Sequence, residues 1–332
     1  MARPTLPRPR IRRGRAGGAT GELAVRAEPR IVEVSANGLT WVHVDEPTSL
    51  EAEALRQRFG FHELDVEDVL SKRQRPKIDE YPDYLFVVLH FPFYDKVVQR
   101  LNAAELDLFL GHDFLITLPN VELTPVTYLF RRCEEDEARR EDLFSKGSGY
   151  LLYHVLDDLF DYCFPILDKI AHKLDAIEDE MFEGRSDEIV RDISNAKQEI
   201  ISYRKIVKPE RATLRALERH TQRFLPQDLE LYFDDIVDAA ERIDDLLDNY
   251  KEVVEGLEST NESVISHRQQ YRLQILTVFT VFFLPLTLIA SVFGMNVLFP
   301  GEGTREAFWV ILGILVAMLA GLLSFFRWKR WL

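Results

Sequence analysis

Two apolar runs without a charged residue lie near the C-terminus of this 332-residue chain. The first, ILTVFTVFFLPLTLIASVF, covers residues 275–293, and the second, AFWVILGILVAMLAGLLSFF, covers residues 307–326. As a helix each would be about 30 Å long, which matches the hydrocarbon core of a bilayer. The alternative is a pair of buried helices in a soluble core, but buried helices seldom run this long without a charge. We therefore expect two transmembrane helices.

The charges around these runs predict how the chain crosses the membrane. Arg268 and Arg272 precede the first run, and the sequence RWKRW, residues 327–331, follows the second. The loop between the runs, residues 294–306, has no such basic excess. The positive-inside rule then places both termini in the cytoplasm and the loop outside. We expect a multi-pass protein of the cell membrane.

The rest of the composition narrows the class of protein. A basic segment rich in proline and glycine, residues 1–29, has no apolar stretch and is expected to be a disordered tail rather than a secretory signal. The net charge of −14 argues against nucleic-acid binding and favours cations as partners. The cysteines, Cys133 and Cys163, are expected to be free thiols.

The pattern of elements predicts an α+β membrane protein. Residues 30–145 alternate between strand and helix patterns, which indicates a cytoplasmic α/β domain with a helix opened by Thr48 or Ser49 and closed by Gly60. Residues 146–226 have the spacing of two antiparallel helices, and residues 227–293 predict one long stalk helix that continues into the first span. The remaining segments are the outer loop, 294–306, the second span, 307–326, and a basic tail, 327–332.

The stalk carries an apolar seam at alternating spacings of three and four residues. Its members are Ile236, Ala240, Ile243, Leu247, Tyr250, Val254, Leu257 and Val264. An oligomeric bundle would bury this seam, and packing on the chain's own domain is the alternative. Nine carboxylates and one base between Asp228 and Asp248 are either a solvated face or a place where divalent cations bridge an assembly.

One face of the first span is lightly polar. On a helical wheel the following residues fall within an arc of about 80°: Thr277, Thr280, Leu284, Thr287 and Ser291. In a monomer these hydroxyls could bond back to carbonyls of the preceding turn. In an oligomer the same stripe would line a central path.

The tripeptide Gly294-Met295-Asn296 ends the first run. Gly294 can adopt positive φ and end the helix, and Asn296 offers an uncharged amide oxygen. Repeated around a symmetry axis, such oxygens could hold hydrated Mg²⁺ weakly enough for conduction. The first span contains no His, Cys or Asp, which mildly favours Mg²⁺ over softer metals, with Co²⁺ or Ni²⁺ as hydrated mimics.

Three stretches of the chain resemble the CorA family of magnesium transporters. The most specific is FLPLTLIASVFGMN, residues 283–296, followed by a short acidic loop and a second span. The other two are FGFHELDVEDVLSKRQRPKIDEYPDYLFVVL, residues 59–89, and YRKIVKPERATL, residues 203–214. The resemblance implies a funnel-shaped homopentamer whose stalk helices and first spans line a pore.

The resemblance also implies roles for individual residues. The filter would be Gly294, Met295 and Asn296, and the pore-lining positions would include Gln270, Leu276, Leu284 and Thr287. Leu276 and Leu284 would form an apolar constriction that closes by excluding water. Cytosolic Mg²⁺ would bind between subunits, from Asp95 of one to Asp235 of the next, and hold the ring closed.

The chain departs from the family pattern at Phe293, where Tyr is usual, at Gln270, where Asn is often found, and at Leu284, where Met is common. The loop also differs, so that Glu302 and Glu306 are only candidate attractors of cations. A zinc transporter of the same fold is the alternative within the family, and a membrane-tethered metal sensor that does not conduct is the alternative outside it. We expect no enzyme, because the chain shows no nucleophile elbow, phosphate loop or metal-hydrolase spacing.

Overall fold

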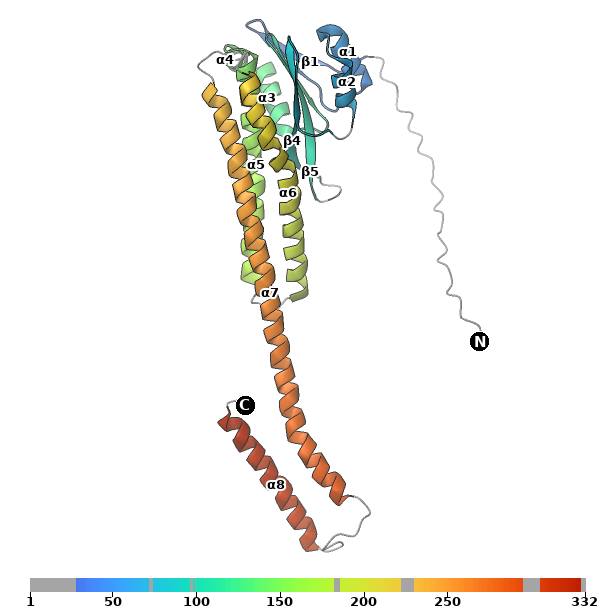
Figure 1. Cartoon of the computed structure of the whole chain (residues 1–332), viewed down its shortest axis with the longest axis vertical. Helices are drawn as coiled ribbons and strands as arrows, with labels where there is room; N and C mark the ends of the chain where they lie inside the picture. The colour runs from blue at the N-terminus through green and yellow to red at the C-terminus, as the bar shows by residue number, and fades with distance from the viewer. Residues whose placement is uncertain are drawn as a thin grey trace, which may run out of the picture. The chain divides into compact units, whose positions relative to one another are not determined.

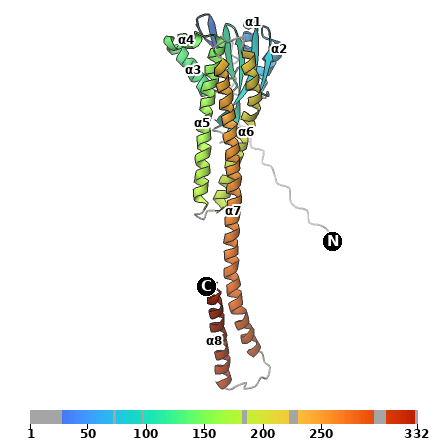
Figure 2. The ribbon, with the colours of Figure 1, turned by 60° about the vertical axis from the view of Figure 1, so that its left-hand side comes forward.

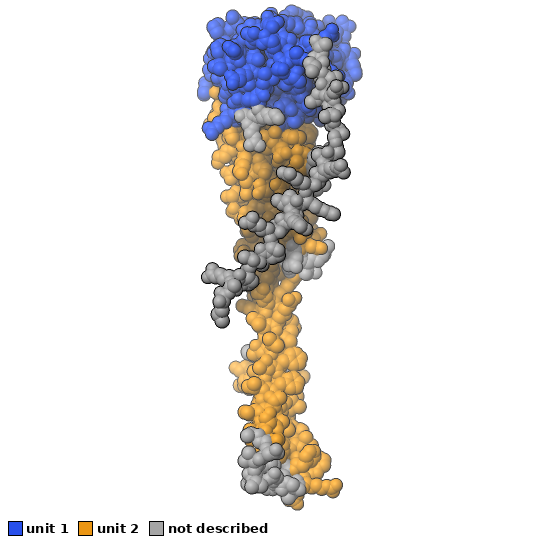
Figure 3. All heavy atoms as spheres, turned by 90° about the vertical axis from the view of Figure 1, so that its right-hand side faces the viewer, with its two compact units in different colours: residues 1–89, 104–155, 219–230 blue, residues 90–103, 156–218, 231–332 orange. Residues whose placement is uncertain are grey.

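The computed structural model describes residues 28–71, 74–95, 98, 100–181, 186–221, 230–294 and 305–329. The chain divides into two units, which Figure 3 colours separately. Unit 1 comprises residues 1–89, 104–155 and 219–230, and unit 2 comprises residues 90–103, 156–218 and 231–332.

Unit 1 is built on a six-stranded sheet with the strand order β1-β2-β6-β5-β4-β3. The strands are β1 Val32–Ala36, β2 Leu39–His43, β3 Lys77–Glu80, β4 Tyr84–Asp95, β5 Arg100–Gly111 and β6 Phe114–Pro119. Strands β2 and β6 pair in parallel, whereas β1 with β2, β3 with β4, and β5 with β6 pair antiparallel. The distal ends of β4 and β5, from His90 and up to Ala103, belong to unit 2.

Local signals in the sequence set the short helices of unit 1: α1 Ser49–Phe59, α2 Glu63–Leu70, α3 Thr124–Glu135 and α4 Glu137–Phe144. Thr48 and Glu51 form a capping box at the start of α1, and Gly60 ends it with φ 75°. This confirms the predicted start and stop of the helix. His62 caps α2, since its side chain accepts a hydrogen bond from the Leu64 N–H at 3.2 Å.

The sheet lies between two pairs of helices, with α1 and α2 on one face and α3 and α4 on the other (Figures 1 and 2). Consecutive residues of β2 place their side chains on opposite faces of the sheet, because side chains alternate along a strand. Val42 belongs to the core that includes Leu55 of α1 and Phe109 of β5. Trp41 packs its ring edge-on against Phe130 of α3, with centroids 5.0 Å apart. Apolar burial on both faces therefore fixes this unit.

Unit 2 consists mainly of long helices: α5 Ser148–Glu180, α6 Ser186–Thr221, α7 Glu230–Phe293 and α8 Arg305–Trp328. The first turns of α5 and the last residues of α6 belong to unit 1. Helix α7 is continuous over 64 residues. Tyr203 of α6 is fully buried and donates its hydroxyl proton to the Cys163 carbonyl of α5 at 3.0 Å. Cys163 and Cys133 are both free thiols, as predicted, and both are buried.

The expectation that an oligomeric bundle buries the stalk seam is wrong. Within a single chain, Ala240, Ile243, Leu247 and Val254 are all 0% exposed. Helices α5 and α6 of the same unit flank α7: Arg242 of α7 stacks over the Phe164 ring of α5 at 5.4 Å. Most of the seam is therefore part of the chain's own core, as in the alternative interpretation. A heptad pattern identifies a face that needs covering but does not identify what covers it.

Ion pairs with α6 neutralise part of the acidic stalk. Arg211 donates to Asp244 at 2.7 Å, and Arg204 pairs with Asp248 at 2.5 Å. Glu241 lies against Arg211 at 3.4 Å and also pairs with Arg215. Four other carboxylates between Asp234 and Asp248 are exposed: Asp234, Asp235, Asp238 and Asp245. These four carboxylates form a solvated acidic face on this part of α7.

Candidate functional site

The polar stripe of the first span lies on the side of α7 turned away from α8. Phe282 is half-buried and its ring meets Phe326 of α8, with centroids 5.1 Å apart. At about 100° per residue, the stripe from Thr277 to Ser291 is centred roughly opposite Phe282. All five stripe residues are exposed in the single chain. α7 therefore presents one apolar face to α8 and the polar face to whatever surrounds the pair.

The three threonine hydroxyls of this stripe bond back to their own helix. Thr277 donates to the Leu273 carbonyl at 2.8 Å, and Thr280 donates to the Leu276 carbonyl at 2.9 Å. Thr287 makes the same bond to Phe283 at 2.9 Å. A hydroxyl has one proton, so each threonine oxygen is left with lone pairs only. The threonines of the stripe are therefore a row of uncharged hydrogen-bond acceptors.

The apolar members of the same face are also uncovered. Leu276 is 62% exposed and Leu284 is 66% exposed. Gln270, one turn and a half before Leu276, is exposed and lines a polar hollow of about 310 Å³ together with Ser263 and Ser266. Polar and apolar rings would therefore alternate along α7 if copies of this face met around an axis.

The end of the first span differs from the expectation at Gly294. Its φ lies outside the left-handed range, and its N–H donates to the Ala290 carbonyl at 2.9 Å. A Cβ at this position would approach the Ala290 oxygen to 3.0 Å, so glycine serves a close contact here rather than a positive φ. Met295, Asn296 and Glu302 lie outside the described residues. Glu306 is exposed in the first turn of α8.

The two predicted regulatory carboxylates are on different elements of unit 2. Asp95 ends β4 and accepts hydrogen bonds from the Val98 N–H at 3.1 Å and from Asn102 Nδ2 at 3.3 Å. Asp235 is exposed in the second turn of α7. Among the described residues of a single chain, no group of three or more His, Cys, Asp or Glu side chains could hold a metal ion. The structure does not bring these two carboxylates together into such a group.

Sequence reasoning missed a buried acid in unit 2. Glu210 of α6 is 2% exposed and accepts a hydrogen bond from the backbone N–H of His90 in β4 at 2.9 Å. Burial raises the pKa of Glu210 to about 7. The sequence did contain a signal for it, because Glu210 follows Pro209 inside an amphipathic helix. A charged residue on the apolar face of a helix is buried only when it has a polar partner.

Helices α7 and α8 are both long and apolar enough to cross a membrane. Their apolar stretches are almost wholly unburied within the chain, and large side chains such as Phe279, Leu288 and Phe308 are more than half exposed. Such surfaces are stable in lipid and not in water. The chain therefore has the architecture of a two-span membrane protein. It combines an α/β domain with a long helix and two apolar spans, and the first span leaves its stripe of acceptors uncovered.

The chain belongs to the family described as CorA-like Mg²⁺ transporter protein, whose model matches residues 36–330. It is similar to the cobalt/magnesium transport protein CorA of Thermotoga maritima, with 28% identity over 298 residues, 88% of this chain and 83% of that protein. It is also similar to the protein of the same name from Methanocaldococcus jannaschii, with 22% identity over 312 residues, 92% of this chain and 96% of that one. The complete structure of the CorA magnesium transporter from Methanocaldococcus jannaschii has the same fold, with a TM-score of 0.80 at 20% identity over 90% of this chain and 94% of that one.

Proposed function

We propose that this protein is a channel that carries Mg²⁺ across a cell membrane, with α7 of several copies around a central pore. The observation that carries the proposal is the exposed stripe on α7, which lies opposite α8 and consists of back-bonded threonines with free lone pairs. Acceptors without charge suit hydrated Mg²⁺, because its bound waters donate hydrogen bonds and are lost reluctantly. The names of the relatives, which are cobalt and magnesium transport proteins, support the choice of ion.

The assembly is proposed to be a homopentamer with both termini on the cytoplasmic side. Five subunits follow from the family resemblance, and the orientation follows from the basic flanks of the two spans. In this assembly Gly294, Met295 and Asn296 form the outer filter, and Glu302 and Glu306 attract cations to it. Leu276 and Leu284 form the constriction that excludes water when the pore is closed. Co²⁺ and Ni²⁺ would pass as hydrated mimics of Mg²⁺.

Regulation by cytosolic Mg²⁺ is part of the same proposal. Asp95 is half-buried and held by two hydrogen bonds, whereas Asp235 is exposed and has no ion-pair partner among the described residues. A cation between Asp95 of one subunit and Asp235 of the next would offset the repulsion between acidic stalks. Loss of that cation would loosen the ring and open the pore.

The test is Mg²⁺ uptake into sealed liposomes that contain the purified protein, reported by a trapped Mg²⁺-sensitive dye. We expect uptake by the native chain and its loss in Asn296→Ala. Asn195→Ala is the control, because Asn195 is an exposed asparagine on α6, away from the spans and from the proposed regulatory site. Uptake of Zn²⁺ but not Mg²⁺ would assign the chain to zinc transport. Uptake of neither ion, by protein shown to be inserted and folded, would overturn the channel and favour a sensor.

A further inference from the structure

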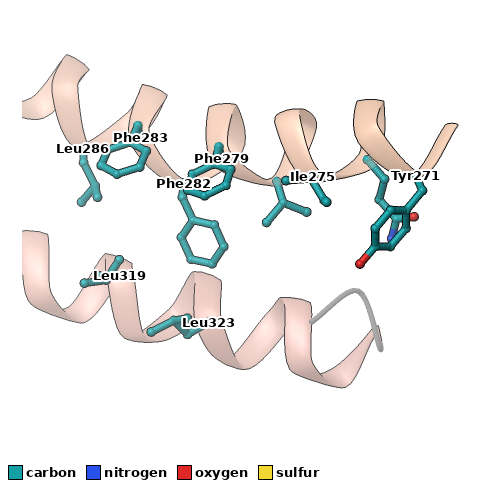
Figure 4. Close-up of a pocket in the computed structure, with 10 residues that line it drawn as sticks. Tyr271, Ile275, Phe279, Phe282, Phe283, Leu286, Leu319 and Leu323 are labelled. Atoms are coloured by element: carbon teal, nitrogen blue, oxygen red, sulfur yellow. The ribbon is translucent and has the colours of Figure 1, made fainter. Parts of the chain in front are cut away.

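An apolar groove runs between α7 and α8 beside the contact of Phe282 with Phe326 (Figure 4). Its volume is about 500 Å³, which is within the range of about 300–1,000 Å³ typical of ligand pockets. Eight of its ten lining residues are apolar, and the two with polar groups, Tyr271 and Gln274, lie at one end. The groove is therefore amphipathic along its length, with a polar mouth and an apolar body.

The polar mouth is flanked by positive charge. Figure 4 shows that Tyr271 lies at the same end of the groove as the C-terminal end of α8, beyond Leu323. Arg272 follows Tyr271, and Arg327 and Lys329 follow Phe326. These three basic side chains are exposed, and none makes an ion pair with a described carboxylate. In a chain of net charge −14 such a local excess of bases would attract an anionic partner.

The groove also lies within the apolar part of the two candidate spans. Ile275, Val278 and Phe282 on α7 and Leu323 on α8 line it, and all belong to the segments long and apolar enough to cross a membrane. A ligand there has to place an apolar portion in the bilayer and a negative portion at its surface. A free anion would leave the apolar body empty, and an apolar helix of a second copy would leave the bases unpaired.

We propose that the groove is a binding site for an anionic phospholipid. An acyl chain would occupy the body from Ile275 toward Leu286, and the phosphate would lie at the mouth near Arg272, Arg327 and Lys329. Charge-assisted hydrogen bonds from guanidinium to phosphate are stronger than neutral ones, and basic pockets between transmembrane helices suit anionic headgroups. The proposal rests on membrane insertion of α7 and α8 and not on ion conduction.

The experiment titrates the detergent-solubilised full chain with phosphatidylglycerol or phosphatidylcholine and measures bound lipid by native mass spectrometry. We expect tighter binding of phosphatidylglycerol. Each basic residue near the headgroup contributes about fivefold to the affinity for an anionic lipid. The combined variant Arg272→Gln, Arg327→Gln and Lys329→Gln should therefore weaken phosphatidylglycerol binding on the order of 100-fold. Binding of phosphatidylcholine should change little. Arg305→Gln, at the other end of α8, is the matched control and should change neither.

A second variant tests the apolar body. Ile275→Trp would fill the groove and should weaken the binding of both lipids. Leu288 is 64% exposed and does not line the groove, so Leu288→Trp should leave the binding of both lipids unchanged. Equal binding of the two lipids, unaffected by the combined glutamine variant, would overturn the proposal. So would a photo-crosslinker at position 275 that forms adducts only with a second copy, because the groove would then be a subunit contact. Lipid binding is measured in the absence of Mg²⁺. A failure of the Mg²⁺ uptake experiment would therefore not affect the result of this one.

Discussion

Glu210 of α6 and His90 of β4 form a buried polar contact inside unit 2. Glu210 Oε1 accepts the His90 backbone N–H at 2.9 Å and lies 3.3 Å from His90 Nδ1. The second carboxyl oxygen, Oε2, is buried without a hydrogen-bond partner among the described atoms. An ionised carboxylate is costly in such a place, which is why burial raises the pKa of Glu210 from 4.5 to about 7.

This contact predicts a loss of stability as pH rises. The pKa of Glu210 is higher in the folded chain than in the unfolded chain, so its contribution is fully present below pH 4.5 and is lost as pH rises through 7. The shift corresponds to roughly 3 kcal/mol. We expect Glu210→Gln, which is neutral throughout, to remove this part of the pH dependence. The measurement is thermal unfolding of the solubilised chain at pH 5 and pH 8, and identical pH profiles for the two proteins would contradict it.

The threonine stripe predicts that transport depends on the hydroxyl oxygens of the threonine side chains and not on the size of these side chains. Thr287→Val keeps the shape but removes the acceptor, and the loss of one hydrogen bond to a hydrated ion should slow Mg²⁺ uptake on the order of tenfold. Thr260→Val is the matched control, because Thr260 makes the same bond to the Gly256 carbonyl at 2.9 Å and lies before the apolar run 275–293. The readout is the initial rate of dye response in liposomes. Equal slowing by both variants would point to a general effect of threonine on α7.

The buried seam predicts a large loss of stability when a cavity is made inside the chain. Leu247→Ala removes a fully buried side chain and should destabilise the chain by about 2–5 kcal/mol. Leu231→Ala, at a position 77% exposed on the same helix, should change stability by less than about 0.5 kcal/mol. Denaturant unfolding measures both. Because the seam is covered within the chain, the Leu247→Ala loss should not depend on protein concentration, as it would if subunits covered it.

The proposed regulatory site predicts a difference between two neighbouring carboxylates. Asp235→Ala should make Mg²⁺ flux insensitive to Mg²⁺ on the cytoplasmic side, whereas Asp234→Ala, also exposed on α7, should leave the sensitivity in place. The physical reason is that a Mg²⁺ bridge requires a carboxylate within reach of Asp95 of the next subunit. The negative charge of the stalk as a whole is not sufficient for such a bridge. Flux is measured in liposomes with graded internal Mg²⁺. Unchanged sensitivity in Asp235→Ala would remove this residue from the gating mechanism.

The sequence predicted elements whose signals are local or periodic. The start of α1 at Thr48 follows from hydrogen bonds within one turn, and the two spans follow from length and lack of charge. The side of α7 that carries Thr277 and Ser291 follows from helical geometry alone. Each of these features depends on residues close together in the chain.

The features that escaped prediction depend on which distant segments meet. A heptad seam has the same pattern whether α6 or a second copy covers Leu247, so periodicity could not choose between them. The pairing of Arg211 with Asp244 joins residues far apart in sequence, and so does the contact of Glu210 with His90. The conformation of Gly294 depends on a close approach to Ala290 that residue type does not reveal.

Pro285 interrupts the mechanical continuity of α7. The helix is about 95 Å long, and α5 and α6 hold its first half by the buried seam and the arginine pairs. Proline has no N–H, so the Val281 carbonyl lacks its helical partner and the helix is easier to bend there. The terminal turns from Pro285 to Phe293 can therefore change tilt without a change in the seam that holds the first half of α7.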